Sequence, residues 1–189
     1  MNKPKPEFDH VQSRYIIVTQ SLVPMLLNIG CNALVSWALW RNHSQLTLWG
    51  EGSFVGGFAF DLLLTAFLIT FITSFFVTSA TRKKIERGEL PLIPREQTRE
   101  RGFERYPTVI RGVWIGMLAV LFGALPLIAF IHLELVTPTT VNSFVFLKAI
   151  WAGVVAAVVS PILTVIGMLR ASIDTYEAEG ARTRPASGA

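Results

Sequence analysis

Four long apolar segments constrain the fold of this chain more than any other feature of its sequence. They cover residues 15–40, 54–80, 109–133 and 144–169, and each is long enough to cross a bilayer, which takes about 20 residues of helix. The chain is 51% hydrophobic and only 16% charged, a composition too apolar for an ordinary soluble domain. We therefore expect an all-α integral membrane protein, in which a four-helix transmembrane bundle forms one domain over residues 15–171.

The distribution of Lys and Arg predicts the orientation of this bundle. Of the 17 basic residues, all but Arg41 and Lys148 fall on the side that carries both termini and the loop between the second and third helices. Cytoplasmic segments of membrane proteins are enriched in Lys and Arg. We therefore expect a multi-pass protein of the cell inner (plasma) membrane, with segment 1–14, the basic loop and segment 172–189 in the cytoplasm. Topology accounts for the positive charge, so no nucleic-acid partner is expected.

Two local predictions concern the cytoplasmic parts. Residues 94–105 begin with a proline, which suits the first turn of a helix, and they carry charges of both signs. This pattern predicts a short surface helix. The tail 172–189 ends in small and polar residues, so we expect it to be disordered.

Two charged residues lie within the apolar segments, Asp61 in the second and Lys148 in the fourth. At 1.5 Å per residue, each lies about 32 Å from an arginine at the inner boundary, Arg82 or Arg170 respectively. Charged side chains inside membrane spans tend to face the interior and pair with one another. We therefore expect an Asp61–Lys148 ion pair near the outer edge of the bilayer. It is either a structural lock between two helices or a gate for a proton or small ion.

Two further groups of polar residues are candidates for the same roles. His132 and Glu134 lie at the outer end of the third helix, but their spacing matches no metal-binding motif. The first helix carries a polar face at steps of seven, four and four residues, composed of Ser21, Asn28, Asn32 and Ser36. That face either forms hydrogen bonds between helices or lines a path for a solute or ion.

Small residues recur along one face of the third and fourth helices. The third carries Gly112, Gly116 and Gly123, and the fourth carries Ala149, Gly153 and Ala157. Such stripes let helix backbones approach closely. We therefore expect the third and fourth helices to pack together, either within one chain or between copies.

The sequence contains no set of residues typical of catalysis. We find no nucleophile–His–acid combination and no phosphate-binding loop, so we expect neither an enzyme nor a cofactor or metal. The single cysteine, Cys31, cannot form an intramolecular disulfide. The first functional hypothesis is a homo-oligomeric transporter or channel for a small ion or solute. The alternative is a non-catalytic accessory or assembly subunit that binds a larger membrane partner.

Overall fold

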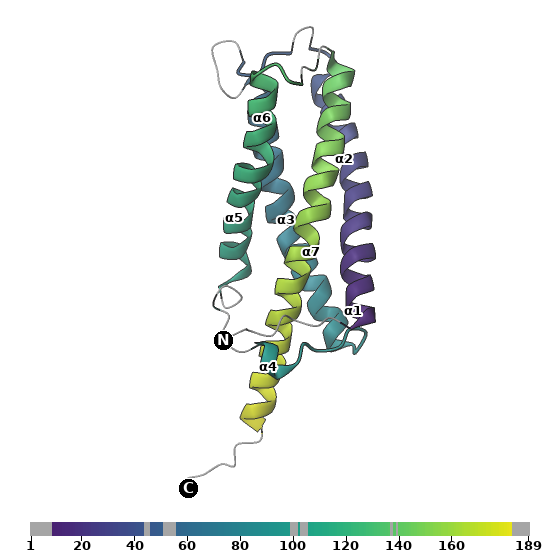
Figure 1. Ribbon diagram of the computed structural model, residues 1–189, viewed down its shortest axis with the longest axis vertical. Helices are drawn as coiled ribbons and strands as arrows, with labels where there is room; N and C mark the ends of the chain where they lie inside the picture. Colours follow the sequence, from purple (N-terminus) through teal and green to yellow (C-terminus); the bar gives the residue numbers. More distant parts are fainter. Residues whose placement is uncertain are drawn as a thin grey trace.

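The computed structural model describes residues 9–43, 46–50, 56–98, 102, 106–136, 138 and 140–182. All regular structure in these residues is helical, and the long helices run side by side (Figure 1). Four helices are long and apolar enough to cross a membrane, which confirms the prediction of an all-α chain with four candidate spans. We call the end where α1 begins and α7 ends the termini end, and the opposite end the far end.

In the described part of the chain, nine helical segments make up these spans and the connection between the second and third. The first span consists of α1 (His10–Arg14), the π-helical segment η1 (Tyr15–Leu22) and α2 (Val23–Trp40), and the second is α3 (Phe58–Glu86). The short helix α4 (Arg95–Thr98) follows among the described residues of the connection. The third span consists of α5 (Thr108–Ala119), the π-helical segment η4 (Val120–Ala124) and α6 (Leu125–His132), and the fourth is α7 (Val141–Arg182).

Both π-helical segments end just before a proline. η1 leads into α2, whose second residue is Pro24, and η4 leads into α6, whose second residue is Pro126. A proline inside a helix removes a backbone donor, and its ring crowds the carbonyl four residues earlier. A wider turn before the proline relieves this crowding, so each span continues through its proline.

Gly57 sets the start of α3. A Cβ at this position would collide with the backbone carbonyl of Leu48, so only glycine allows the two backbones to approach. The carbonyls of Thr47 and Leu48 accept hydrogen bonds of 3.2 and 3.0 Å from the first two N–H groups of α3. Those N–H groups have no partner within the helix. The capped start places Asp61 in the first turn of α3.

α7 is the central helix of the bundle. It packs against both α2 and α3, and α3 also packs against α5. The buried apolar side chains form three clusters, and α7 contributes to each of them. Its contributions include Phe144 at the far end, Val159 in the middle and Met168 at the termini end. Because α7 lies between its neighbours, a side chain such as that of Lys148 on its inner face is buried.

α7 extends beyond the expected fourth helix. It remains helical to Arg182, which corrects the expectation of disorder for residues 172–182. The segment before α4 packs on this extension: the Ile93 N–H donates to the Ser172 hydroxyl at 3.0 Å, and the Tyr176 hydroxyl donates to the Ile93 carbonyl at 3.0 Å. The helix expected over 94–105 is observed only as α4. Residues 99–101, 103–105 and 183–189 lie outside the described part of the chain.

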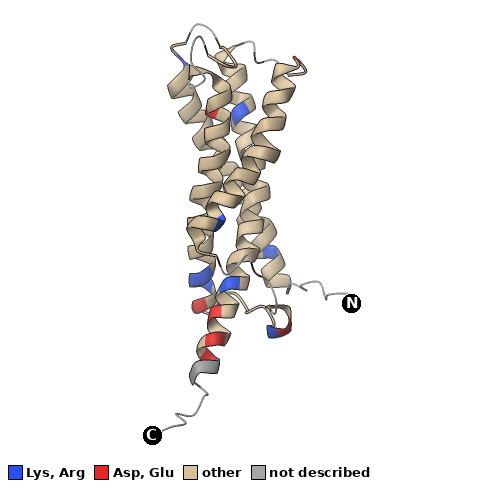
Figure 2. Ribbon diagram, turned by 90° about the vertical axis from the view of Figure 1, so that its left-hand side faces the viewer, with Lys and Arg blue, Asp and Glu red and all other residues tan. Residues whose placement is uncertain are grey.

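Charged residues gather at the termini end of the bundle (Figure 2). Several form local pairs there, such as Arg82 with Glu86 at 2.8 Å and Lys84 with Glu89 at 2.7 Å. The hydrogen bond from Lys84 lowers the pKa of Glu89, which lies in the connection after α3. The charged residues of the far end therefore stand apart from this group.

Candidate functional site

The structure brings Asp61 and Lys148 together inside the bundle near its far end. The Lys148 ammonium nitrogen lies 2.7 Å from each carboxylate oxygen of Asp61. The Trp40 indole N–H donates to the same carboxylate at 3.1 Å, and the Thr65 hydroxyl donates to it at 3.4 Å. This ion pair therefore joins the last residue of α2, the first turn of α3 and the start of α7.

The ion pair is poorly accessible from outside the protein. The Lys148 side chain is 2% exposed and that of Asp61 is 19% exposed. The Phe144 ring packs nearby, with its centre 4.9 Å from that of Phe58 and 5.6 Å from that of Trp40. An unpaired charge in such surroundings costs several kcal/mol, whereas these two charges compensate each other. The start of α3 further favours a negative charge on Asp61, because the N-terminal end of a helix dipole is positive.

The sequence analysis did not identify Trp40 as a partner of Asp61. The signal was present, because Trp40 continues the four-residue steps of the polar face that includes Asn32 and Ser36. A tryptophan at the end of a span is also typical of the membrane interface. That explanation was sufficient for Trp40, so its place on the polar face was not considered. In the structure Trp40 is 8% exposed, so it belongs to the core.

The polar residues of the first span make one hydrogen bond to another helix and two within their own helix. The Ser21 hydroxyl donates to the Ala157 carbonyl of α7 at 2.9 Å. The side-chain amides of Asn28 and Asn32 donate to carbonyls of their own helix four residues earlier, at 2.9 and 3.0 Å. Ser36 is fully buried. Each of these three bonds is accepted by a helix backbone carbonyl.

The small residues of the third span contact a different helix from the expected one. Gly112 and Gly116 of α5 lie against α3, where a Cβ would come within 3.2 Å of the Phe71 ring and 2.9 Å of the Phe67 ring. The expectation that these glycines pack against the fourth span is therefore wrong. A glycine stripe offers a flat helix surface, but the partner is decided by the large side chains that fill it.

The small residues of the fourth span pack against α2. A Cβ at Gly153 would lie 2.5 Å from Ile29 Cγ1, so the two helices approach closely there. Ala149 is buried, and Ala157 accepts the hydrogen bond from Ser21. This stripe therefore supports the contact between the first and fourth spans.

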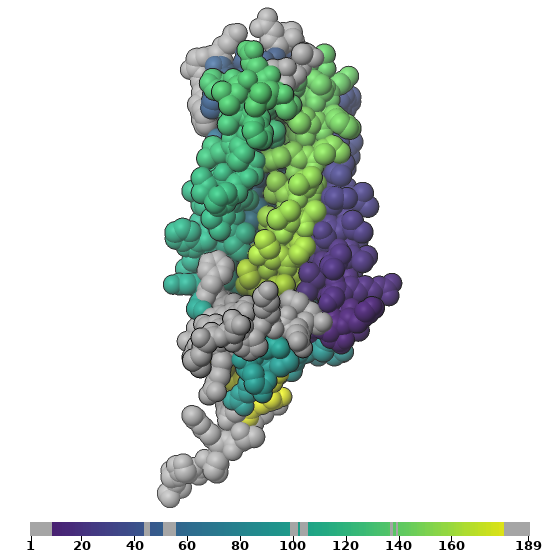
Figure 3. All heavy atoms as spheres, in the orientation of Figure 1, coloured from purple at the N-terminus to yellow at the C-terminus, as the bar shows by residue number. Residues whose placement is uncertain are grey.

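The third and fourth spans meet at Gly123. The Trp151 indole N–H of α7 donates to the Gly123 carbonyl at 3.2 Å, and a Cβ at Gly123 would lie 3.5 Å from a Val155 methyl carbon. Towards the termini end, a furrow runs between α5 and α7 (Figure 3). Among the small residues of the third span, Gly123 thus has the expected partner.

His132 and Glu134 lie at the far end but are exposed. The His132 ring lies edge-on to Trp49, with 6.2 Å between their centres, and Glu134 has a left-handed backbone with φ of 58° after the end of α6. In the described part of the chain, neither residue is among the hydrogen-bond or ion-pair partners of Asp61. Nor do any three His, Cys, Asp or Glu side chains there form a group that could hold a metal ion.

The four long apolar helices indicate a membrane protein, and the ion pair forms a polar cluster inside the bundle. Comparison of the chain with protein-family models, with curated proteins and with solved structures finds no match.

Proposed function

We propose that this chain is a non-catalytic subunit of a membrane assembly, in which the Asp61–Lys148 pair holds the helices together. The closed ion pair carries this proposal. Lys148 lies 2.7 Å from both carboxylate oxygens, and Trp40 and Thr65 add two more donors. A gate must exchange partners to load and release an ion, whereas this carboxylate already has a full set of donors.

The exposed apolar surface supports a role in assembly. In the most apolar 18-residue stretch of the first span, only 6% of the residues are buried within the chain. Leu26 and Leu34 on α2 are 64% and 71% exposed. In a bilayer such a face contacts lipid or a helix of another protein, and a partner helix associates through packing and hydrogen bonds. We assign the outward face of α2 to the protein partner of this proposal, and the variant Leu34→Trp tests that assignment.

The test compares the wild-type chain with the variant Asp61→Asn/Lys148→Met, which removes both charges. We expect the wild-type protein, purified in mild detergent, to have a protein mass above the 21.0 kDa of one chain and a fixed ratio to a second protein. The double variant should retain that partner as long as it is folded. The variant Leu34→Trp, on the outward face of α2, should lose it.

Transport is a second candidate, and the inner face of α3 favours it. Asp61 remains partly exposed, and α3 buries three hydroxyl-bearing residues further along, at Thr70, Ser74 and Thr81. Hydroxyl groups inside a membrane protein provide donors and acceptors for a proton. Proton flux through liposomes that contain only the wild-type chain, lost in a folded double variant, would support transport and contradict the subunit proposal.

A further inference from the structure

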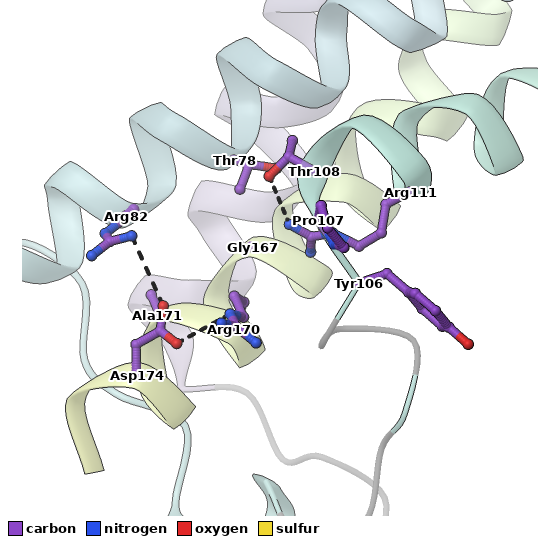
Figure 4. Close-up of a pocket in the computed structure, with 10 residues that line it drawn as sticks. All are labelled: Thr78, Arg82, Tyr106, Pro107, Thr108, Arg111, Gly167, Arg170, Ala171 and Asp174. Atoms are coloured by element: carbon purple, nitrogen blue, oxygen red, sulfur yellow. Dashed lines mark hydrogen bonds and ion pairs between the residues drawn. The ribbon is translucent and has the colours of Figure 1, made fainter. Parts of the chain in front are cut away.

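A cavity of about 300 Å³ lies at the termini end, between three of the spans. Each span contributes one arginine to its lining: Arg82 from α3, Arg111 from α5 and Arg170 from α7 (Figure 4). Asp174 is the carboxylate of the lining, 3.1 Å from Arg170 and 3.9 Å from Arg82. Arg82 also pairs with Glu86, which lies outside the lining, at 2.8 Å. With both carboxylates counted, the three arginines still leave an excess of positive charge.

The chemistry of this lining suits a phosphate group. A guanidinium is planar and presents a fork of donors that matches phosphate oxygens. Arg111 is 4% exposed, and the Thr108 hydroxyl accepts a hydrogen bond of 3.1 Å from it. The lining residues Pro107 and Thr108 form the start of α5, so the positive end of that helix dipole also faces the cavity.

The cavity lies at the depth where a bilayer places its head groups. Arg111 is the fourth residue of the third candidate span, which begins at Thr108. Tyr106 lines the cavity and is 53% exposed. Trp114, three residues after Arg111, is 60% exposed. Exposed aromatic side chains of this kind are typical of the membrane interface. An anion bound at this level is therefore within reach of the lipids of the leaflet that faces the termini.

An apolar groove of about 540 Å³ lies about one helical turn from the cavity, between the same two helices α5 and α7. Its walls include Ile115 and Leu118 of α5, and Ile162 and Ile166 of α7. Arg111 and Ile115 are one helical turn apart, as are Ile166 and Arg170, so about 6 Å separates the two regions along each helix. The groove is the furrow between α5 and α7 that Figure 3 shows.

We propose that the arginine-lined cavity and this groove together bind one anionic phospholipid of the leaflet that faces the termini. The phosphate-bearing head group occupies the cavity, and one acyl chain lies in the groove between α5 and α7. Charge complementarity and depth favour a lipid as the occupant. An apolar partner helix would fill the groove but would supply no negative charge to the arginines.

The test measures lipid affinity on the purified full-length chain in a neutral detergent. Phosphatidylglycerol and phosphatidylcholine with identical acyl chains are titrated, and binding is followed by native mass spectrometry and thermal unfolding. We expect phosphatidylglycerol to bind more tightly and to raise the unfolding temperature. Arg170→Gln and Arg82→Gln should each weaken phosphatidylglycerol binding about fivefold. They should weaken phosphatidylcholine binding less, because its cationic choline offsets the charge of the phosphate that both lipids carry. Arg87→Gln, an exposed arginine outside the cavity, is the matched control.

A second variant tests the groove and does not depend on the arginines. Val158 lines the groove and is 58% exposed, so Val158→Trp should fill the groove without disturbing the core. It should weaken the binding of phosphatidylglycerol but not that of inorganic phosphate. Ile72→Trp, at an exposed position of α3 outside the groove, is its control for lipid binding.

Three results would overturn the proposal. Equal affinity for the two lipids would remove the role of the arginines. Inorganic phosphate that protects the chain as well as phosphatidylglycerol does, with no effect of Val158→Trp, would show a site for a free anion. A dimer that is broken by Val158→Trp and unaffected by lipid would show that a second copy fills the groove.

Discussion

Removal of one member of the Asp61–Lys148 pair should destabilise the fold more than removal of both. In Asp61→Asn the ammonium of Lys148 keeps its charge in a position only 2% exposed and loses its carboxylate. Breaking a buried ion pair in this way costs about 3–5 kcal/mol. Lys148→Met should cost less, about 1–3 kcal/mol, because Asp61 is partly exposed and keeps its hydrogen bonds from Trp40 and Thr65. The order of the two single variants is therefore part of the prediction.

The double variant Asp61→Asn/Lys148→Met should recover part of the loss. A buried pair replaced by neutral groups of similar volume is often close to neutral in stability, so the coupling energy should be at least as large as the loss in Asp61→Asn, about 3–5 kcal/mol. The assay is equilibrium unfolding in mixed micelles, followed by far-ultraviolet circular dichroism. The control cycle uses Arg82→Gln and Glu86→Gln, whose side chains are 59% and 58% exposed. Its coupling should stay below about 1 kcal/mol. Additive single and double changes at Asp61 and Lys148 would refute the reasoning.

Three other predictions test separate parts of the account. Trp40→Phe removes a hydrogen bond to a carboxylate and should lower the free energy of unfolding by about 1.5–3 kcal/mol. The control is the exposed Trp37→Phe, and equal losses would show that the Trp40–Asp61 hydrogen bond does not stabilise the fold. Gly153→Leu intrudes on Ile29 and should lower the free energy of unfolding by at least about 1–3 kcal/mol. The same change at Gly30, where the structure has open space, should have little effect. Similar losses for the two variants would place the α2–α7 contact elsewhere. Reporter fusions at Asn42 should report the outer side of the membrane and fusions at Glu89 the cytoplasm, because Lys and Arg concentrate around Glu89; a cytoplasmic signal at Asn42 would reverse the orientation.

The number and position of the helices could be predicted because span length leaves a clear signal in the sequence. About twenty consecutive residues that are predominantly apolar identify a span, whatever its neighbours are. The number of residues from each charge to the arginine at the inner boundary predicted that Asp61 and Lys148 lie at the same depth. The structure places their charged groups 2.7 Å apart. Helical rise alone was enough for that prediction, because both helices run in the same direction.

The helix neighbours could not be predicted from the stripes of small residues. Gly116 and Gly153 each permit a close approach, but the sequence does not state which side chain fills the space. Phe67 fills it at Gly116 and Ile29 fills it at Gly153, so the two stripes serve different helix pairs. The extent of α7 was missed for a related reason. The polar residues beyond its span are helical because Ser172 and Tyr176 contact Ile93, and such tertiary contacts leave no periodic signal.

The cavity with three arginines was also missed, because a topological explanation had already accounted for the charge. Arg82, Arg111 and Arg170 lie at three separate places in the sequence. Each one alone marks the end of a span. Only the packing of α3, α5 and α7 brings them to one cavity.

The most direct test of the account is the contact between the Lys148 ammonium and the Asp61 carboxylate in a lipid bilayer. Solid-state NMR can measure the dipolar coupling between ¹⁵Nζ-labelled lysine and ¹³Cγ-labelled aspartate in the reconstituted full-length chain. Among the described residues, Lys84 pairs with a glutamate, so the expected lysine–aspartate signal comes from Lys148 and Asp61. The account predicts a strong coupling, in keeping with the 2.7 Å between nitrogen and oxygen, that disappears in Lys148→Met. A wild-type coupling no stronger than that of Lys148→Met would contradict it.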